Sequence, residues 1–182
     1  IECAVPVIAV NQVGANDDLI FDGRSVVMGH DGTVRDVLAG FEPEVRTVDI
    51  PEKAQGLPSL GPSSTHAAVH QWSNPNAELF HALALGIRDY CRKTGNSRVL
   101  LGLSGGIDSA LTAVLATAAL GPDNVHGVLM PSKFSSPGSI DDSLELSRRL
   151  GVKHVVQVPI KAIHQAMHDT LEPALHETTG GL

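Results

Sequence analysis

The chain has 182 residues, of which 42% are hydrophobic, and this is enough to bury a core in one or two domains. A formal net charge of -7 argues against a nucleic-acid-binding surface, and no apolar run approaches the roughly 18 residues that a membrane span needs. The two cysteines, Cys3 and Cys91, cannot form a disulfide framework and fit a reducing compartment, so we expect a cytoplasmic protein.

The N-terminal segment, residues 1–50, favours β structure. Residues 5–10 form a short apolar run rich in β-branched side chains, which is typical of a buried strand. Asp31-Gly32 predicts a hairpin, because both turn positions tolerate positive φ, and residues 16–18 are interpreted as a turn between strands. The alternation in residues 44–50 predicts another strand. Strands without helices leave a sheet uncovered, so this segment does not close a domain alone.

Residues 51–75 contain four prolines with glycines and serines between them, which is typical of a linker arm. Asn74 and Pro75 then predict a helix start, and Gly95 predicts its end. The apolar residues between them recur at the three- and four-residue spacing of one helix face: Leu79, Phe80, Leu83, Ile87, Tyr90 and Cys91.

From there the predicted elements alternate strictly. Strands are expected over residues 98–103, 125–130 and 155–158, and helices over residues 109–120, 139–150 and 162–176. This order predicts an α/β fold with a parallel, doubly wound sheet and right-handed crossovers.

The first of these strands runs into a glycine-rich turn that opens a helix, in the stretch LLGLSGGIDSAL. Such a turn places backbone N–H groups at the positive end of a helix, where phosphate binds well. Asp108 would repel a polyphosphate unless a divalent cation lies between them, and Mg²⁺ binds in this way through one or two carboxylates and phosphate oxygens. The loop therefore predicts a nucleotide with Mg²⁺ at Asp108. The alternative interpretation is a tight structural turn in which Asp108 caps the helix.

The stretch SGGIDS matches the SGGxDS signature of the PP-loop ATP pyrophosphatases, which cleave ATP between the α and β phosphates. The segment from Leu129 to Ser136, with Ser139 to Ser143 after it, resembles the MPSxxSS…SxxDA stretch of NAD synthetases. Upstream, the segment from Val10 to Gly23 resembles the last part of a nitrilase-type amidase domain. Amidase followed by PP-loop is the layout of the glutamine-dependent NAD synthetases, which the chain resembles over nearly its whole length.

This resemblance implies an ATP-dependent ligase that forms NAD from deamido-NAD through an acyl adenylate, with ammonia from glutamine hydrolysis. It also implies a homo-oligomer, and a nucleotide as partner rather than nucleic acid or membrane. Leu129 and Met130 are expected to line the adenine, and Ser135 and Ser136 to lie on a loop that closes over phosphate. An ordinary serine-rich turn is the alternative for these two serines. The full predicted ATP site is Gly102, Leu103, Ser104, Gly105, Gly106, Ile107, Asp108, Ser109, Leu129, Met130, Ser135 and Ser136.

The same resemblance divides the chain into part of a glutaminase domain (residues 1–50), a linker arm (51–75) and part of a PP-loop domain (76–182). We expect a fragment of a longer protein, inactive by itself. Cys3 is not expected to be the glutaminase nucleophile, because the residues that flank a nitrilase nucleophile are missing around it. The alternative function is a non-catalytic module that binds an adenine nucleotide.

Overall fold

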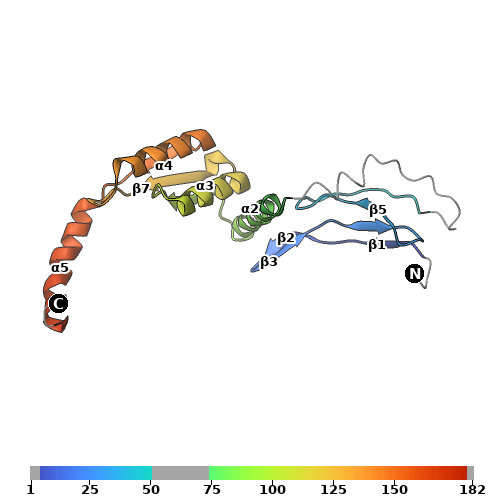
Figure 1. Ribbon diagram of the computed structural model, residues 1–182, viewed down its shortest axis with the longest axis horizontal. Coiled ribbons are helices and arrows are strands. Elements are labelled where there is room, and N and C mark those ends of the chain that lie inside the picture. Colours follow the sequence, from blue (N-terminus) through green and yellow to red (C-terminus); the bar gives the residue numbers. More distant parts are fainter. Residues whose placement is uncertain (1–4, 51–73, 180–182) are drawn as a thin grey trace. The chain divides into compact units, whose positions relative to one another are not determined.

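The computed structural model describes the backbone of residues 5–50 and 74–179 and the side chains up to residue 173. Cys3 and most of the arm, including residues 51–73, lie outside the described residues. Contacts divide the chain into two compact units, Ile1–Gly95 (unit 1) and Asn96–Leu182 (unit 2) (Figure 1). No helix within the described ranges is both long and apolar enough to cross a membrane.

Unit 1 contains two small antiparallel sheets. One has the strand order β1-β4-β5 and the other pairs β2 with β3. The turn between β4 and β5 is closed by the Gly29 N–H, which donates to the Thr33 carbonyl at 2.9 Å, so the hairpin predicted at Asp31-Gly32 is confirmed. Of the turn predicted at residues 16–18, residues 17–18 form the turn between β2 and β3, whereas Asn16 is the last residue of β2. The strands are β1 (Val7–Ala9), β2 (Val13–Asn16), β3 (Leu19–Asp22), β4 (Val26–Met28) and β5 (Val34–Val37).

Two of the β predictions need correction. All three residues of β1 are exposed, so residues 5–10 do not form a buried strand. Residues 44–50 form no strand at all. Instead, the Glu44 carboxylate accepts a hydrogen bond from the Ala39 N–H at 2.7 Å, and Arg46 forms an ion pair with the buried Asp36 carboxylate at 2.7 Å. Side-chain bonds thus hold this segment where a strand ladder was expected.

Helix α2 (Pro75–Lys93) begins and ends as predicted. The Asn74 side chain accepts from the Asn76 N–H at 3.0 Å, and the chain leaves the helix at Gly95 with φ +74°. The predicted packing face is only partly right, because Leu79 and Tyr90 are 57% and 67% exposed although Cys91 is buried. A different face of α2 packs on β2 and β3, and its side chains include polar ones.

Unit 2 confirms the predicted α/β class. Its parallel sheet has the strand order β6-β7-β8, and register pairs Gly102 with Val128 and Leu129 with Gln157. The strands are β6 (Val99–Gly102), β7 (Val125–Leu129) and β8 (His154–Gln157). The connections and the last helix are α3 (Ile107–Leu120), the short helix η1 (Pro122–Asn124), α4 (Pro137–Leu150) and α5 (Lys161–Thr179).

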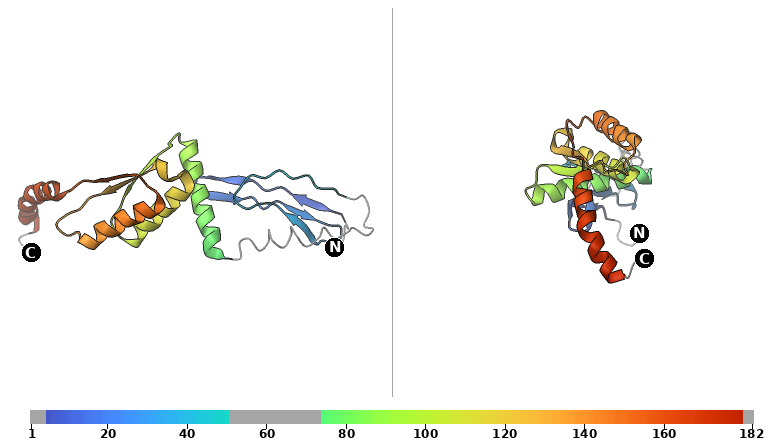
Figure 2. Two further views of the ribbon diagram at one scale, coloured as in Figure 1. Left: turned by 90° about the horizontal axis from the view of Figure 1, so that it is seen from above. Right: turned by 90° about the vertical axis from the view of Figure 1, so that its left-hand side faces the viewer.

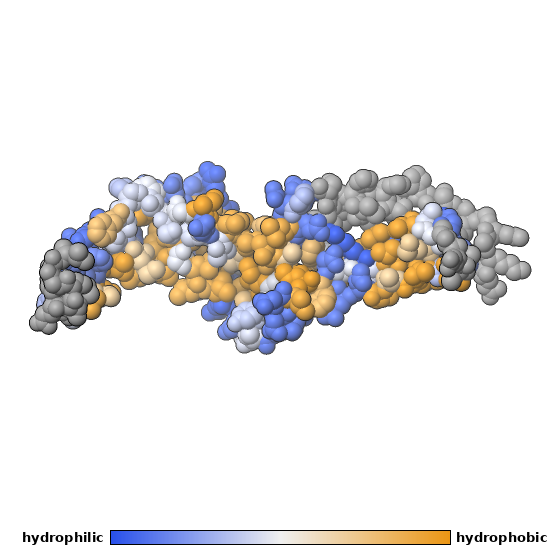
Figure 3. Space-filling model, turned by 60° about the horizontal axis from the view of Figure 1, so that its bottom comes forward, coloured by the Kyte–Doolittle hydropathy of each residue, from blue (hydrophilic) through white to orange (hydrophobic). Residues whose placement is uncertain are grey.

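Helices α3 and α4 cover the same face of this sheet (Figure 2, left). Two successive right-handed crossovers in one direction require this, because each returns over the same side. Buried Leu103, Leu129 and Val125 face the helices and form the core with Ala113 and Ala116; the opposite face carries exposed side chains, including Leu100 and Val156. Apolar residues also reach the surface of both units elsewhere (Figure 3). The two helices therefore cover one face of the sheet, and the carboxyl ends of β6 and β7 are not covered by them.

Candidate nucleotide site at the carboxyl ends of β6 and β7

The loop of residues 104–106 connects the carboxyl end of β6 to the first turn of α3. The Leu103 N–H donates to the Val128 carbonyl at 2.8 Å, which extends the pairing of β6 with β7 up to the loop. Because parallel strands end at the same edge of a sheet, the loop lies beside the segment that follows β7. Ligands of open α/β sheets bind at this edge.

Two serines hold the loop in shape. The Ser104 and Ser109 hydroxyls lie 3.1 Å apart, and the Ser109 hydroxyl donates to the Gly106 carbonyl at 3.0 Å. The Gly106 N–H in turn donates to the Ser104 hydroxyl at 3.3 Å. Both serines belong to the predicted ATP site, and these hydrogen bonds also stabilise the turn itself.

The first turn of α3 presents backbone donors without a side-chain cap. Gly106 is the N-cap residue and makes no side-chain capping bond. The N–H groups of Ile107, Asp108 and Ser109 therefore lack an intrahelical acceptor and can donate to a ligand. These groups and the helix dipole together favour an anion. The exposed Asp108 carboxylate makes no hydrogen bond or ion pair with any residue that the structure describes.

Gly105 packs directly on the first turn of α4. Its φ is +78°, and a Cβ atom built on it would lie 2.5 Å from the Ser139 carbonyl oxygen and 2.6 Å from Ser139 Cα. These are backbone atoms of a helix and cannot swing away, so only glycine fits. The loop of residues 104–106 and the start of α4 are therefore held in van der Waals contact.

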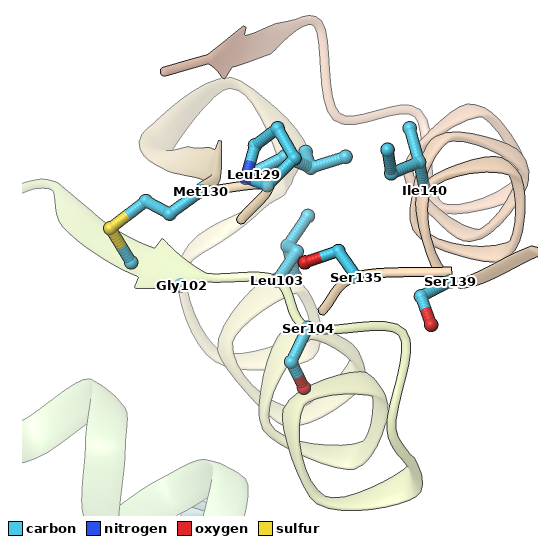
Figure 4. A pocket seen from close by; sticks show the side chains of 9 residues that line it. Gly102, Leu103, Ser104, Leu129, Met130, Ser135, Ser139 and Ile140 are labelled. Atoms are coloured by element: carbon cyan, nitrogen blue, oxygen red, sulfur yellow. The ribbon is translucent and has the colours of Figure 1, made fainter. Parts of the chain in front are cut away.

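A cavity of about 220 Å³ opens between these elements (Figure 4). Leu103, Leu129 and Ile140 extend into it from β6, β7 and α4, and the Met130 side chain reaches across to Gly102. Its walls are apolar deeper in and carry serine hydroxyls towards the loop. The residues around it are Gly102, Leu103, Ser104, Leu129, Met130, Pro131, Ser135, Ser139 and Ile140.

The predicted site residues divide into three groups. Six of them line the cavity: Gly102, Leu103, Ser104, Leu129, Met130 and Ser135. Five form the adjoining turn and helix start: Gly105, Gly106, Ile107, Asp108 and Ser109. Ser136 does neither, since it is the N-cap of α4 and accepts from the Ser139 N–H at 3.1 Å. Pro131, Ser139 and Ile140 were missed, although the first two stand in the motif that pointed to NAD synthetases.

The loop after β7 also fits both interpretations of its serines. The Ser135 hydroxyl accepts from the Ser132 N–H at 3.0 Å, and the Ser132 hydroxyl accepts from the Phe134 N–H at 3.1 Å. This is the bonding of a serine-rich turn. Ser135 nevertheless lines the same cavity as Ser104 of the glycine-rich loop.

The residues present fit a magnesium ion bound mainly by its nucleotide. The described side chains contain no cluster of three His, Cys, Asp or Glu that would form an all-protein metal site. Mg²⁺ does not need one, because it keeps several waters and takes one or two carboxylates together with phosphate oxygens. Asp108, in the first turn of α3 and without a protein partner in the described residues, is the carboxylate available for this.

Comparison with known proteins finds curated relatives that match most of this chain. The chain is 44% identical over 155 residues to the glutamine-dependent NAD(+) synthetase of Rhodobacter capsulatus, which covers 84% of this chain and 27% of that protein. It is 41% identical over 183 residues to the Synechocystis sp. enzyme of the same name, covering 98% of this chain and 31% of that protein. The chain thus spans less than a third of the length of these relatives.

A solved structure of a relative has a similar fold. The glutamine-dependent NAD+ synthetase of Acinetobacter baumannii, in complex with adenosine diphosphate, superposes with a TM-score of 0.75 at 31% identity, over 94% of this chain and 31% of that one. The family model of NAD synthase matches residues 79–181, more than half of the chain and including the whole loop and cavity. The chain therefore belongs to the NAD synthase family.

Proposed function

We propose that this chain supplies the ATP-binding part of a ligase that forms NAD from deamido-NAD. The observation that carries the proposal is the SGGIDS loop, placed at the carboxyl end of β6 with uncapped N–H groups beside an apolar cavity. The relative solved with adenosine diphosphate supports a nucleotide as the occupant.

In the proposed reaction, a carboxylate oxygen of deamido-NAD attacks the α-phosphorus of ATP, and the bond to the bridging oxygen of the β-phosphate breaks. Pyrophosphate leaves with that electron pair, and ammonia then displaces AMP from the acyl adenylate to give the amide. The N–H groups of Ile107, Asp108 and Ser109 would meet the charge that grows on the leaving pyrophosphate. Mg²⁺ at Asp108 would neutralise part of that charge when bound.

The apolar part of the cavity suits the adenine ring. Leu129 and Met130 are proposed to line it, with Leu103 and Ile140 as neighbours. A Cβ atom on Gly102 would lie 3.4 Å from Met130 Cε, in van der Waals contact with the flexible end of that side chain. Ser104, Ser135 and Ser139 stand between this apolar part and the loop and offer hydroxyls to the ribose and phosphates.

The wider organisation is also a proposal. Residues 1–50 are assigned to a glutaminase domain, which would release ammonia from glutamine, and residues 76–182 to the synthetase domain. By packing, α2 belongs with the N-terminal strands, whereas the family match that begins at residue 79 assigns it to the synthetase. The cytoplasmic location and the homo-oligomer stay predictions.

The test is NAD formation by the full-length synthetase that contains these residues. With ATP, Mg²⁺ and deamido-NAD, we expect NAD when either glutamine or ammonium chloride is the nitrogen source, measured by a cycling assay for NAD. If ATP binds but neither source gives NAD, the site is a non-catalytic nucleotide module and the proposal is wrong.

A further inference from the structure

Helix α2 contacts the N-terminal strands through one continuous stripe of side chains. Within unit 1, α2 packs on β2 and β3. Several of the α2 residues that are buried or bonded within unit 1, including two whose partners are Arg24 and Phe41 outside the strands, follow one another at three- or four-residue intervals, so they share one helix face. They are Glu78, His81, Leu85, Asp89 and Lys93.

Asp89 and Lys93 bind both polar groups of one backbone residue. The Asp89 side chain is buried, and its Oδ2 accepts a hydrogen bond from the Ala15 N–H at 2.9 Å. One turn later, the Lys93 ammonium donates to the carbonyl oxygen of the same Ala15 and, at 3.3 Å, to Asn16 Oδ1. The strand β2 pairs only with β3 in the described sheet, so Ala15 lies on a free edge. The two side chains thus take the place of a neighbouring strand.

The backbone next to Ala15 is shaped for this contact. Gly14 has a φ of +145°, and a Cβ atom at this position would lie 3.1 Å from Asp89 Oδ2. The carboxylate can approach the strand edge closely because residue 14 has no side chain. Asp89 therefore recognises main-chain geometry, which fixes both the position and the rotation of the helix against β2.

The other end of α2 is anchored independently. Glu78 forms an ion pair with Arg24 at 2.8 Å, and the His81 ring stacks on Phe41 with ring centroids 6.3 Å apart. The Arg24 guanidinium also lies over the Phe41 ring, 5.7 Å from its centroid. Contacts thus hold α2 near both of its ends.

The segments joined in this way belong to different proposed domains. The strands β2 and β3 stand in the part assigned to the glutaminase, whereas all of α2 beyond its first four residues, including Asp89, lies within the family match that begins at residue 79. Residues 94–98 alone separate α2 from β6, whose carboxyl end carries the ATP loop. The contact therefore joins the β2–β3 pair to the helix that directly precedes the synthetase sheet in the sequence.

We propose that Asp89 is a positioning residue that couples glutamine hydrolysis to NAD synthesis by clamping α2 to the edge of β2. This rests on the proposed function. Ammonia that is released at one domain reaches the acyl adenylate efficiently only if the two domains keep a fixed relation, whereas ammonia added in excess arrives from solvent regardless. Loss of the clamp should therefore affect glutamine-driven synthesis far more than ammonia-driven synthesis.

The experiment compares the Asp89→Ala, Asp89→Asn and Arg92→Ala variants of the full-length synthetase. In Asp89→Ala we expect the ratio of glutamine-driven to ammonia-driven NAD synthesis to fall about tenfold, and hydrogen exchange at the Ala15 amide to accelerate about 10- to 100-fold, since this N–H loses its partner. Asp89→Asn keeps an acceptor oxygen, so both its activity ratio and its Ala15 exchange rate should lie between those of the wild type and Asp89→Ala. Arg92→Ala is the control: its side chain is 72% exposed and pairs with Asp89 at 3.4 Å, so little should change.

Two results would overturn the coupling role. One is an unchanged ratio in Asp89→Ala although Ala15 exchange has accelerated; the other is an equal loss of both activities, which is what simple destabilisation produces. Unchanged exchange at the Ala15 amide in Asp89→Ala would show that Asp89 does not hold this N–H group. The exchange measurement does not depend on enzyme activity. If the wild-type enzyme makes no NAD from ammonia, the proposed function is wrong, but the contact between Asp89 and Ala15 can still be tested by exchange.

Discussion

Replacing Asp108 with Asn should lower deamido-NAD-dependent exchange of pyrophosphate into ATP by roughly 100- to 1,000-fold, the usual effect of removing one charge-stabilising group from a site of this kind. Asp108 is the acidic residue in the first turn of α3, and its carboxylate has no protein partner among the described residues. Asn has nearly the same shape but no charge, so the loop should keep its fold while losing its hold on the cation. Exchange of labelled pyrophosphate in the full-length synthetase measures this step alone.

A matched carboxylate serves as the control for Asp108. Asp123 is also exposed in unit 2, where it pairs with Lys153 at 3.1 Å near the start of β7, at the other end of the strand from the loop. Asp123→Asn should leave exchange within about twofold of wild type, because exposed ion pairs contribute little. Glutamine hydrolysis should continue in both variants. Full exchange in Asp108→Asn would remove the cation role assigned to this residue.

Replacing Gly105 with Ala should weaken ATP binding at least tenfold and destabilise the protein. Two costs combine: a left-handed backbone costs alanine about 1–2 kcal/mol, and overpacking against the Ser139 backbone costs about 1–3 kcal/mol more. To relieve the clash with the Ser139 backbone, the loop must move away from α4. This movement also displaces the N–H groups of the first turn of α3. Calorimetric titration with ATP and urea unfolding measure the two effects.

A variant at Gly151 distinguishes the cost of the left-handed backbone from the cost of overpacking. It ends α4 with φ +74°, but its Cβ would meet nothing closer than 3.7 Å, an ordinary contact. Gly151→Ala should therefore show only the backbone cost, about 1–2 kcal/mol, with unchanged ATP affinity. If Gly105→Ala behaves like Gly151→Ala in both measurements, the contact between the loop and α4 does not position the site.

Local signals predicted most of unit 2 and the ends of α2. Alternating elements predicted the parallel sheet, and Asn74, Pro75 and Gly95 act at the helix ends as their chemistry requires. The strand predicted at residues 44–50 was wrong, because alternation indicates that a segment can form a strand but does not indicate whether a partner strand is available. Glu44 and Arg46 found side-chain partners instead.

The parts that were missed depend on contacts between distant segments. Ser139 lines the cavity because Gly105 lets the loop pack on α4, and no local pattern encodes that meeting. The packing face of α2 was misjudged for a similar reason. Hydrophobic spacing selected Leu79 and Tyr90, whereas the helix is held by Asp89, whose partner is a main-chain N–H 74 residues away.

We propose that this loop binds pyrophosphate as the leaving group while the α-phosphorus is attacked. Phosphorus NMR of the full-length synthetase with ATP, Mg²⁺, deamido-NAD and ammonia identifies which bond of ATP is cleaved. We expect AMP and pyrophosphate in equal amounts with each NAD formed. ADP and inorganic phosphate as the products would contradict it.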